Sequence, residues 1–140
     1  MVRFQLSRWL QAADRIYDED KLLDHWISLE GLFGDGRSEL SLTASLRAAA
    51  YVGSTPADRE AIYRSLRLSY RWRSYVVHGG GAAGAPRDLT KHGTLRESAT
   101  ATRAILRSVL LKLIQSREAF SADTVEEILF HRIEGDEIDP

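Results

Sequence analysis

The sequence predicts a single all-α domain, and three observations lead to this expectation. Apolar residues recur at steps of three and four along almost the whole chain, which is the spacing of one helix face. Helix start and stop signals separate these segments at short intervals. No segment alternates between apolar and polar residues for long enough to indicate a strand. Because 140 residues suffice to bury one core, we expect a bundle of four or five main helices.

The first two helices are predicted from apolar stripes near the N-terminus. The first stripe consists of Leu6, Trp9, Leu10, Ala13 and Ile16. The sequence YDED then breaks this pattern and offers Asp18 or Asp20 as the N-cap of the next helix. The second stripe consists of Leu22, Leu23, Trp26, Leu29 and Phe33. Gly34 marks the expected end of this second helix.

Two further helices are predicted before a glycine-rich loop. Ser38 is the expected cap of the third helix, whose alanines in ELSLTASLRAAAYV favour close contact with a neighbouring helix. Ser54 or Thr55 caps the fourth helix, with Pro56 in its first turn. This helix is expected to extend to about His78. The sequence GGGAAGAPRD after it is predicted to be a flexible loop without helix or strand.

The rest of the chain is predicted to form one long helix and one short one. The long helix extends from about Leu89 to Arg117, and Gly93 is a residue that delays its start. A short helix follows within SADTVEEILFHRI, capped by Ser121 or Asp123, before a polar tail. We therefore divide the chain into a helical bundle at residues 1–120 and a short helix with an acidic tail at residues 121–140.

Composition excludes several classes of site. There are no cysteines, so disulfides, Cys-based zinc sites and thiol nucleophiles are ruled out. No apolar run approaches the roughly 18 residues of a membrane-spanning helix, and the N-terminal MVRFQLSRWLQ lacks the apolar centre of a signal peptide. The four histidines show no metal-binding spacing, and the glycine run lacks the Lys-Ser/Thr of a phosphate-binding loop. We therefore expect a cytoplasmic protein without a metal or other cofactor, and no membrane partner.

Charge is unevenly distributed along the chain. Residues 1–120 contain 18 Lys and Arg against 13 Asp and Glu, whereas residues 121–140 contain one Arg against seven acids. A mildly basic body permits contact with nucleic acid. The acidic tail is then a potential competitor for the same basic surface.

The fourth helix presents two different faces. Its apolar stripe, formed by residues such as Leu66, Tyr70 and Val77, also contains Arg73. Because an unpaired charge on an apolar stripe is costly, Arg73 needs a carboxylate, and Glu30 occupies the matching place in the second helix. We predict a bidentate ion pair between Glu30 and Arg73. A second, basic face contains Arg64, Arg67, Arg71, Ser74 and His78. On an ideal helix His78 points about 140° away from Arg73.

Both Arg73 and His78 have a purely structural interpretation. A Glu30–Arg73 ion pair fixes the register of two helices, and a histidine in a last helical turn, followed by Gly79, interacts favourably with the helix dipole. On spacing alone these structural roles are favoured over catalytic ones.

The stretch RSYVVHG contains an arginine, a polar residue, three further residues and a histidine. It resembles the R-x4–6-H signature of HEPN domains (higher eukaryotes and prokaryotes nucleotide-binding). Together with the upstream blocks DKLLDHWISLEGLF and YRWRSYVVHG, it is similar to the ApeA-like HEPN subgroup over roughly residues 4–115. The resemblance implies an up-down four-helix bundle with one short additional C-terminal helix. It also implies a homodimer in which the motifs of two chains face one cleft.

In active members the resemblance implies a metal-independent endoribonuclease of toxin–antitoxin or antiphage defence, with an antitoxin or a fused defence module as partner. Arg73, Ser74 and His78 match the catalytic motif, while Tyr70 and Glu30 match its structural support. Arg71 also fits the looser motif spacing and is an alternative to Arg73.

The implied reaction is attack of an RNA 2′-hydroxyl on the adjacent phosphate. His78 acts as general base or acid, Arg73 stabilises charge on the phosphate, and Ser74 orients nearby groups. Arg64, Arg67 and Arg71 then hold the RNA backbone. The alternative function is a non-catalytic dimerisation or nucleotide- or RNA-binding module of a defence protein.

Overall fold

The computed structural model describes residues 2–34 and 40–116, and within these ranges the chain is all-helical without strands. The helices are α1 (Val2–Ala12), α2 (Asp18–Phe33), α3 (Leu40–Val52), α4 (Pro56–Val77), α5 (Arg87–Thr90) and α6 (Leu95–Gln115). The all-α prediction is confirmed. The expected cap Ser38, the end of the long helix at Arg117 and the short helix with its tail at residues 121–140 lie outside the described residues. None of the described helices is long and apolar enough to cross a bilayer.

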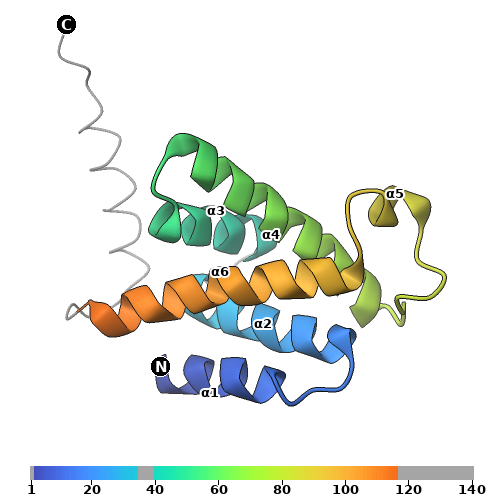
Figure 1. Cartoon of the computed structure of the whole chain (residues 1–140), viewed down its shortest axis with the longest axis horizontal. Helices are drawn as coiled ribbons and strands as arrows, with labels where there is room; N and C mark the ends of the chain where they lie inside the picture. The colour runs from blue at the N-terminus through green and yellow to red at the C-terminus, as the bar shows by residue number, and fades with distance from the viewer. Residues whose placement is uncertain (1, 35–39, 117–140) are drawn as a thin grey trace, which may run out of the picture.

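Helix α6 connects the parts of this arrangement. It runs across the molecule in Figure 1 and contacts α1, α2, α3 and α4. Helices α1 and α2 pack against each other in opposite directions, and the short α5 lies beyond the end of α4. The predicted stripe of α2 is confirmed for Leu22, Trp26, Leu29 and Phe33, which are buried in the core, whereas Leu23 is only partly buried. The largest fully buried apolar side chains are Trp26, Trp72, Phe33, Leu22, Leu29, Leu66 and Leu106.

The start of α4 follows its predicted capping signal. Thr55 Oγ1 accepts a hydrogen bond from the Asp58 N–H at 3.1 Å, and Pro56 takes the first helical position. Thr55, and not Ser54, is therefore the N-cap residue. The Ser54 N–H and hydroxyl both donate to the Asp58 carboxylate, which closes this turn from the other side.

The long C-terminal helix begins later than predicted. Gly93 has a φ of +142°, a conformation that a helix cannot contain, and Thr94 forms a capping box with Glu97. Helix α6 therefore starts at Leu95, whereas the expected start was Leu89. The delaying role that the sequence indicated for Gly93 is confirmed.

Two other local predictions are wrong. The N-cap of α2 is Tyr17, whose side chain makes no capping hydrogen bond, while Asp18 and Asp20 lie in the first turn, where they favour the helix dipole. The segment predicted as a loop after α4 ends at Asp88 and so overlaps α5, which begins at Arg87 and ends at Thr90. This single turn is stabilised by the burial of Leu89 against the core. The glycine-rich sequence before it gives no indication of this burial.

Two predicted apolar stripes are also displaced. Leu10 and Ile16 are 54% and 86% exposed, because α1 ends at Ala12 and buries that residue instead. On α4, Val77 is 53% exposed, whereas Trp72 is almost completely buried. Apolar spacing alone does not show which of two adjacent rows of residues on a helix is buried. The large indole of Trp72 gains more free energy from burial than the smaller side chain of Val77 does.

Two features hold α4 firmly against its neighbours. The predicted close packing of the α3 alanines is confirmed, since Ala44 and Ala48 are fully buried and α3 packs on α4. A chain of hydrogen bonds also crosses the core: Trp26 Nε1–H donates to Ser69 Oγ at 2.8 Å, and Ser69 Oγ lies 2.5 Å from Thr102 Oγ1. Because these buried polar groups are partnered, they fix α4 between α2 and α6.

Candidate functional site

A glycine-based cap closes the C-terminal end of α4. Gly79 has a φ of +88°, the left-handed conformation that favours glycine. The Gly79 N–H donates to Val76 O at 2.9 Å, and the Gly80 N–H donates to Tyr75 O at 3.0 Å. These two bonds form a Schellman motif, so the predicted role of Gly79 just after the helix is confirmed.

His78 lies at this cap with its side chain in solvent. It is the C-cap residue of α4, and its backbone N–H donates to Ser74 O at 3.2 Å. His78 is exposed, whereas Ser74 one turn earlier is partly buried. An exposed imidazole at a helix end is accessible for proton transfer, and it is equally suited to the helix dipole.

Arg73 lies against α2 and forms the predicted ion pair. Its Nη2 atom is 3.4 Å from Glu30 Oε1, and its guanidinium lies over the Tyr70 ring at 5.4 Å. Tyr70 in turn packs edge-on against Trp26, with ring centroids 5.1 Å apart. The structure therefore brings Glu30, Tyr70 and Arg73 together as one cluster.

The expected form of this ion pair is wrong. One contact replaces the predicted bidentate fork, and the Arg73 and Glu30 side chains keep 28% and 22% exposure. Trp72 occupies the neighbouring core position, which leaves Arg73 at the edge of the buried face. Among residues 2–34 and 40–116, no hydrogen bond or ion pair joins Arg73 to His78. The two motif residues are thus on one helix but are not in polar contact.

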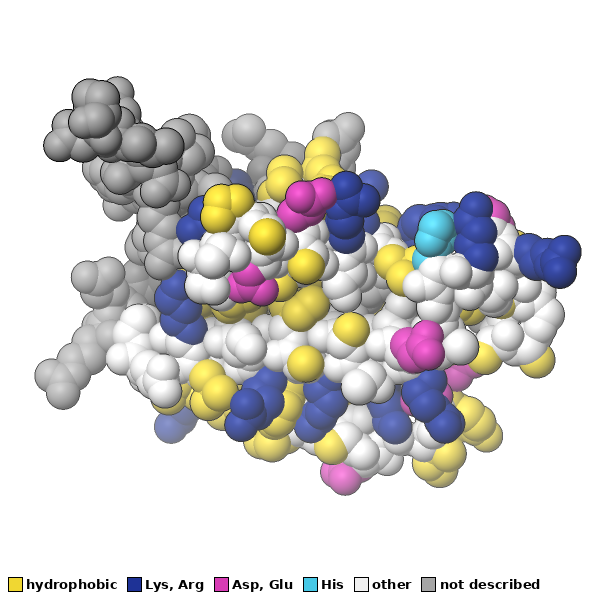
Figure 2. All heavy atoms as spheres, turned by 45° about the horizontal axis from the view of Figure 1, so that its top comes forward, with side chains coloured by type: hydrophobic (Ala, Val, Ile, Leu, Met, Phe, Trp, Pro, Cys, Tyr) yellow, Lys and Arg dark blue, Asp and Glu magenta, His cyan; other side chains and the backbone are white. Residues whose placement is uncertain are grey.

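The three arginines predicted to bind RNA line one open groove of about 450 Å³. Arg64, Arg67 and Arg71 follow one another along α4, and Tyr63 and His92 complete the polar and aromatic lining. Figure 2 shows basic side chains beside a histidine at the end of the molecule that carries α5. We call this surface the α4 groove. It combines positive charge, an aromatic ring and a titratable side chain.

The arginine side chains of the α4 groove make only weak interactions with other groups of the protein. Arg64 Nη2 pairs with Glu60 at 2.6 Å and Arg71 Nη2 pairs with Asp88 at 3.2 Å, and the side chains of both pairs are largely exposed. Arg67 donates to a neutral serine hydroxyl of α3 at 3.1 Å. Exposed ion pairs contribute at most about 1 kcal/mol. An incoming phosphate can therefore replace these carboxylates at little cost.

Sequence reasoning missed His92. This residue reaches the α4 groove because α5 packs on α4 and directs the following turn toward it. No periodic pattern connects a loop residue to a helix face that lies so far away in sequence. The one available signal is the clustering of Arg87, Lys91 and His92 in a short basic stretch.

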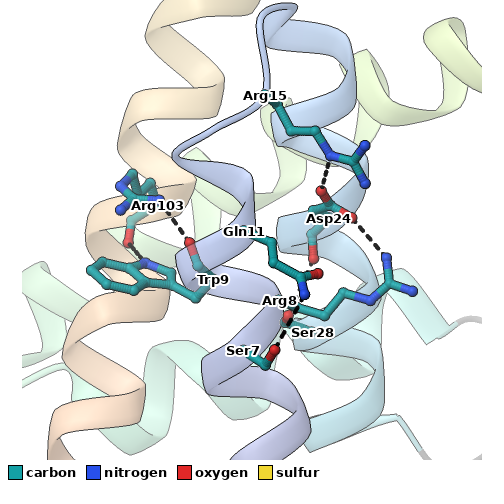
Figure 3. A network of polar contacts seen from close by, with 8 residues as sticks. All are labelled: Ser7, Arg8, Trp9, Gln11, Arg15, Asp24, Ser28 and Arg103. Atoms are coloured by element: carbon teal, nitrogen blue, oxygen red, sulfur yellow. Dashed lines mark hydrogen bonds and ion pairs between the residues drawn. The ribbon is translucent and has the colours of Figure 1, made fainter.

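A buried carboxylate between α1 and α2 was also missed. Asp24 accepts from Arg8 Nη1 at 2.7 Å and from Arg15 Nε at 2.8 Å, and its side chain is 5% exposed (Figure 3). Burial raises the pKa of Asp24, but the hydrogen bonds and charges of Arg15 and Arg8 outweigh it and hold this pKa below its usual value. This network fastens α1 to α2. Its one sequence signal is the spacing of two arginines, seven residues apart, ahead of an acidic stretch.

Within the described ranges, no group of three or more His, Asp or Glu residues lies close enough together to hold a metal ion. Scans against protein-family models, curated proteins and solved structures give no match to this chain. The geometry of the α4 groove and of the α4 end is therefore the basis for a functional proposal.

Proposed function

We propose that this protein binds RNA along the α4 groove and cleaves it at the C-terminal end of α4, as a metal-independent endoribonuclease of the HEPN type. One observation carries the proposal: Arg64, Arg67 and Arg71 line a single groove, and the same helix face leads on to His78. Phosphates spaced along a single strand match a line of cations, and Tyr63 offers a ring on which a base can stack.

The proposed chemistry needs no cofactor. The 2′-hydroxyl attacks the adjacent phosphorus, the bond to the 5′ oxygen breaks, and a cyclic phosphate and a 5′-hydroxyl result. His78 takes the proton from the attacking hydroxyl or supplies one to the leaving oxygen. His92 lines the groove and is a candidate for the complementary proton transfer.

Arg73 stabilises the charge that develops on the phosphate in this proposal. Its contact with Glu30 is single and partly exposed, so the guanidinium retains donors for a phosphate oxygen. Ser74, between Arg73 and His78 in sequence, orients nearby groups. Arg71 is the alternative arginine, because it shares the His78 face and already lines the groove.

The resemblance to ApeA-like HEPN domains adds a biological context to the proposal. It implies an up-down four-helix bundle, a homodimer with two motifs at one cleft, and a cytoplasmic role in toxin–antitoxin or antiphage defence. A dimer would supply a second His78 to each cleft, which offers another way to provide both an acid and a base.

A cleavage assay tests this function. The full chain is incubated with end-labelled structured and unstructured RNAs in the presence of a chelator, and the product ends are analysed for a cyclic phosphate. We expect the wild-type protein to cleave RNA. His78→Ala should abolish this cleavage without changing the melting temperature of the protein, and Arg107→Gln on α6 should cleave at the wild-type rate. Intact RNA at every protein concentration, or equal cleavage by His78→Ala, would overturn the nuclease assignment.

A second candidate function is a non-catalytic RNA- or nucleotide-binding or dimerisation module. The cluster of Glu30, Tyr70 and Arg73 favours it, because this packing explains Arg73 as a structural residue. RNA that binds with a strong salt dependence but stays intact is the result expected from this alternative.

A further inference from the structure

A second cavity lies apart from the α4 groove, between α1, α2 and α6. Its volume is about 240 Å³, and its walls come from the end of α1, the first half of α2 and the first half of α6. The space exists because small side chains, Ala12, Ala13 and Ala99, stand where the three helices meet. It is large enough for several water molecules or one small solute.

One wall of this cavity is a buried histidine with an unpartnered nitrogen. His25 is 1% exposed, and its Nδ1 atom has no hydrogen-bond partner. Buried polar atoms in folded proteins are nearly always hydrogen-bonded, because an unpartnered one is destabilising. Burial, and next the charge of Arg103, lower the pKa of His25 to about 4, so the ring is neutral near pH 7. The ring therefore forms a neutral wall of the cavity, and its Nδ1 atom lies too deep for a solute to reach it.

Two cations line the same cavity. Arg103 uses one donor, Nη1, for Trp9 O at 3.0 Å, and its guanidinium lies over the Trp9 ring at 4.0 Å (Figure 3). An arginine has five N–H donors in a rigid fork, so this clamp orients Arg103 without exhausting it. Lys21 lies one helical turn before His25 on α2 and supplies the second charge.

The acidic groups near the cavity are already neutralised. Asp18, on the cavity wall, pairs with Arg96 at 3.0 Å and with Lys21 at 3.7 Å. Asp24, next to His25 in sequence, is held by two arginines of the α1 region, as described above. The local balance of charge is therefore positive, which favours an anion over a cation.

We propose that this cavity is a binding site for a small oxyanion, a phosphate or carboxylate group, held by Lys21 and Arg103 beside the neutral His25 ring. The ligand lies against this ring, so the His25 signals report its binding. The cavity and the α4 groove share no lining residue. The oxyanion proposal can therefore be tested independently of the RNase proposal.

Titrations of the full chain observed by NMR test the site. The histidine ring signals are assigned with His25→Gln and are followed as inorganic phosphate, acetate or sodium chloride is added at matched ionic strength. We expect saturable shifts of the His25 signals with phosphate or acetate and none with chloride. The stronger of the two anions identifies the preferred headgroup.

Two variants and one control make the result specific. Lys21→Gln should weaken binding about tenfold or more, which is the loss of one charge-assisted hydrogen bond. Ala13→Leu should block the site by filling it, since Ala13 is exposed at the rim and its replacement breaks no contact of the core. Arg107→Gln removes the same charge outside the cavity, so this variant should bind phosphate and acetate with the wild-type affinity. Absence of saturable His25 shifts, or equal weakening by Arg107→Gln, would show that the cavity holds only water.

Discussion

Glu30 Oε1 lies 3.4 Å from Arg73 Nη2, and this contact joins α2 to the last turns of α4. Tyr70 completes the cluster beneath the guanidinium. The arrangement is strong enough to orient Arg73 but leaves much of its hydrogen-bonding capacity unused. Arg73 is thus positioned by α2, and the proposed function assigns its remaining N–H donors to a bound phosphate.

The first prediction follows from this partial exposure. Both Arg73→Gln and Glu30→Gln should lower the free energy of unfolding by only about 1 kcal/mol, because the pair is a single contact near solvent. Urea denaturation of both variants and of the double variant measures the coupling between the two side chains. A loss of several kcal/mol would show that Arg73 is primarily a structural residue.

The same two variants should differ in RNA cleavage. Arg73→Gln should lower the cleavage rate about 100-fold, the usual cost of removing one group that stabilises transition-state charge. Glu30→Gln should change it little, because the guanidinium is retained. Single-turnover rates with one labelled RNA measure this contrast. Cleavage by Arg73→Gln at the wild-type rate would exclude Arg73 from catalysis and make Arg71 the better candidate.

Asp24 should dominate the stability of the N-terminal helices. Asp24→Asn removes the charge that holds Arg8 and Arg15 together, and we expect a loss of about 3 kcal/mol near pH 7. Because the folded-state pKa of Asp24 lies below 3.8, the contribution is present above that pH and disappears as pH falls through the folded pKa. The difference in unfolding free energy between wild type and Asp24→Asn should therefore shrink at the lowest pH values. A difference that is independent of pH would contradict this assignment.

His25 should add a separate pH dependence at higher pH. Its folded-state pKa of about 4 lies below its unfolded value of 6.5. Between these values the unfolded chain binds a proton that the folded protein does not, so stability falls as pH drops from 6.5 toward 4. The full loss is about 3 kcal/mol. Urea denaturation at several pH values should show this slope in wild type and in His92→Gln, but not in His25→Gln. An unchanged slope in His25→Gln would contradict the low pKa.

The helices could be predicted from sequence where their signals are local. Thr55 and Pro56 mark the start of α4, and the apolar spacing of α2 identifies most of its buried apolar residues, although it includes Leu23, which is only partly buried, and omits Leu32. The Glu30–Arg73 contact was also predictable, because each charge interrupts an apolar stripe. Its partial exposure was not, since Trp72 takes the core position through packing that spacing does not encode.

The parts of the site that sequence could not reveal depend on contacts between distant segments. His92 enters the α4 groove through the packing of α5 on α4, which relies on the burial of Leu89. His25 is isolated on a helix surface until α1 and α6 cover it. Residues whose environment comes from other helices carry no periodic signal of their own.

Gly79 should control the position of His78. Its φ of +88° is strained for any residue with a Cβ, although no atom lies within 4 Å of the place a Cβ would occupy. Gly79→Ala should therefore cost about 1 kcal/mol through backbone strain alone, whereas Gly79→Asn should cost less, because asparagine tolerates this conformation. Thermal melts measure the stability. If the end of α4 positions His78 for cleavage, Gly79→Ala should also slow cleavage more than Gly79→Asn does.

The α4 groove makes a final, quantitative prediction about RNA affinity. Each arginine that contacts a phosphate of a single strand contributes about 0.7 to the slope of log affinity against log salt. Arg67→Gln and Arg71→Gln should each lower the slope by roughly this amount and weaken binding of unrelated RNA sequences equally. Arg107→Gln should leave the slope unchanged, because that side chain lies in an apolar groove between α1 and α6. Fluorescence anisotropy of a labelled oligonucleotide at several salt concentrations measures the slopes. If Arg107→Gln lowers the slope as much as Arg67→Gln does, RNA is attracted by overall charge, and the α4 groove is not its binding site.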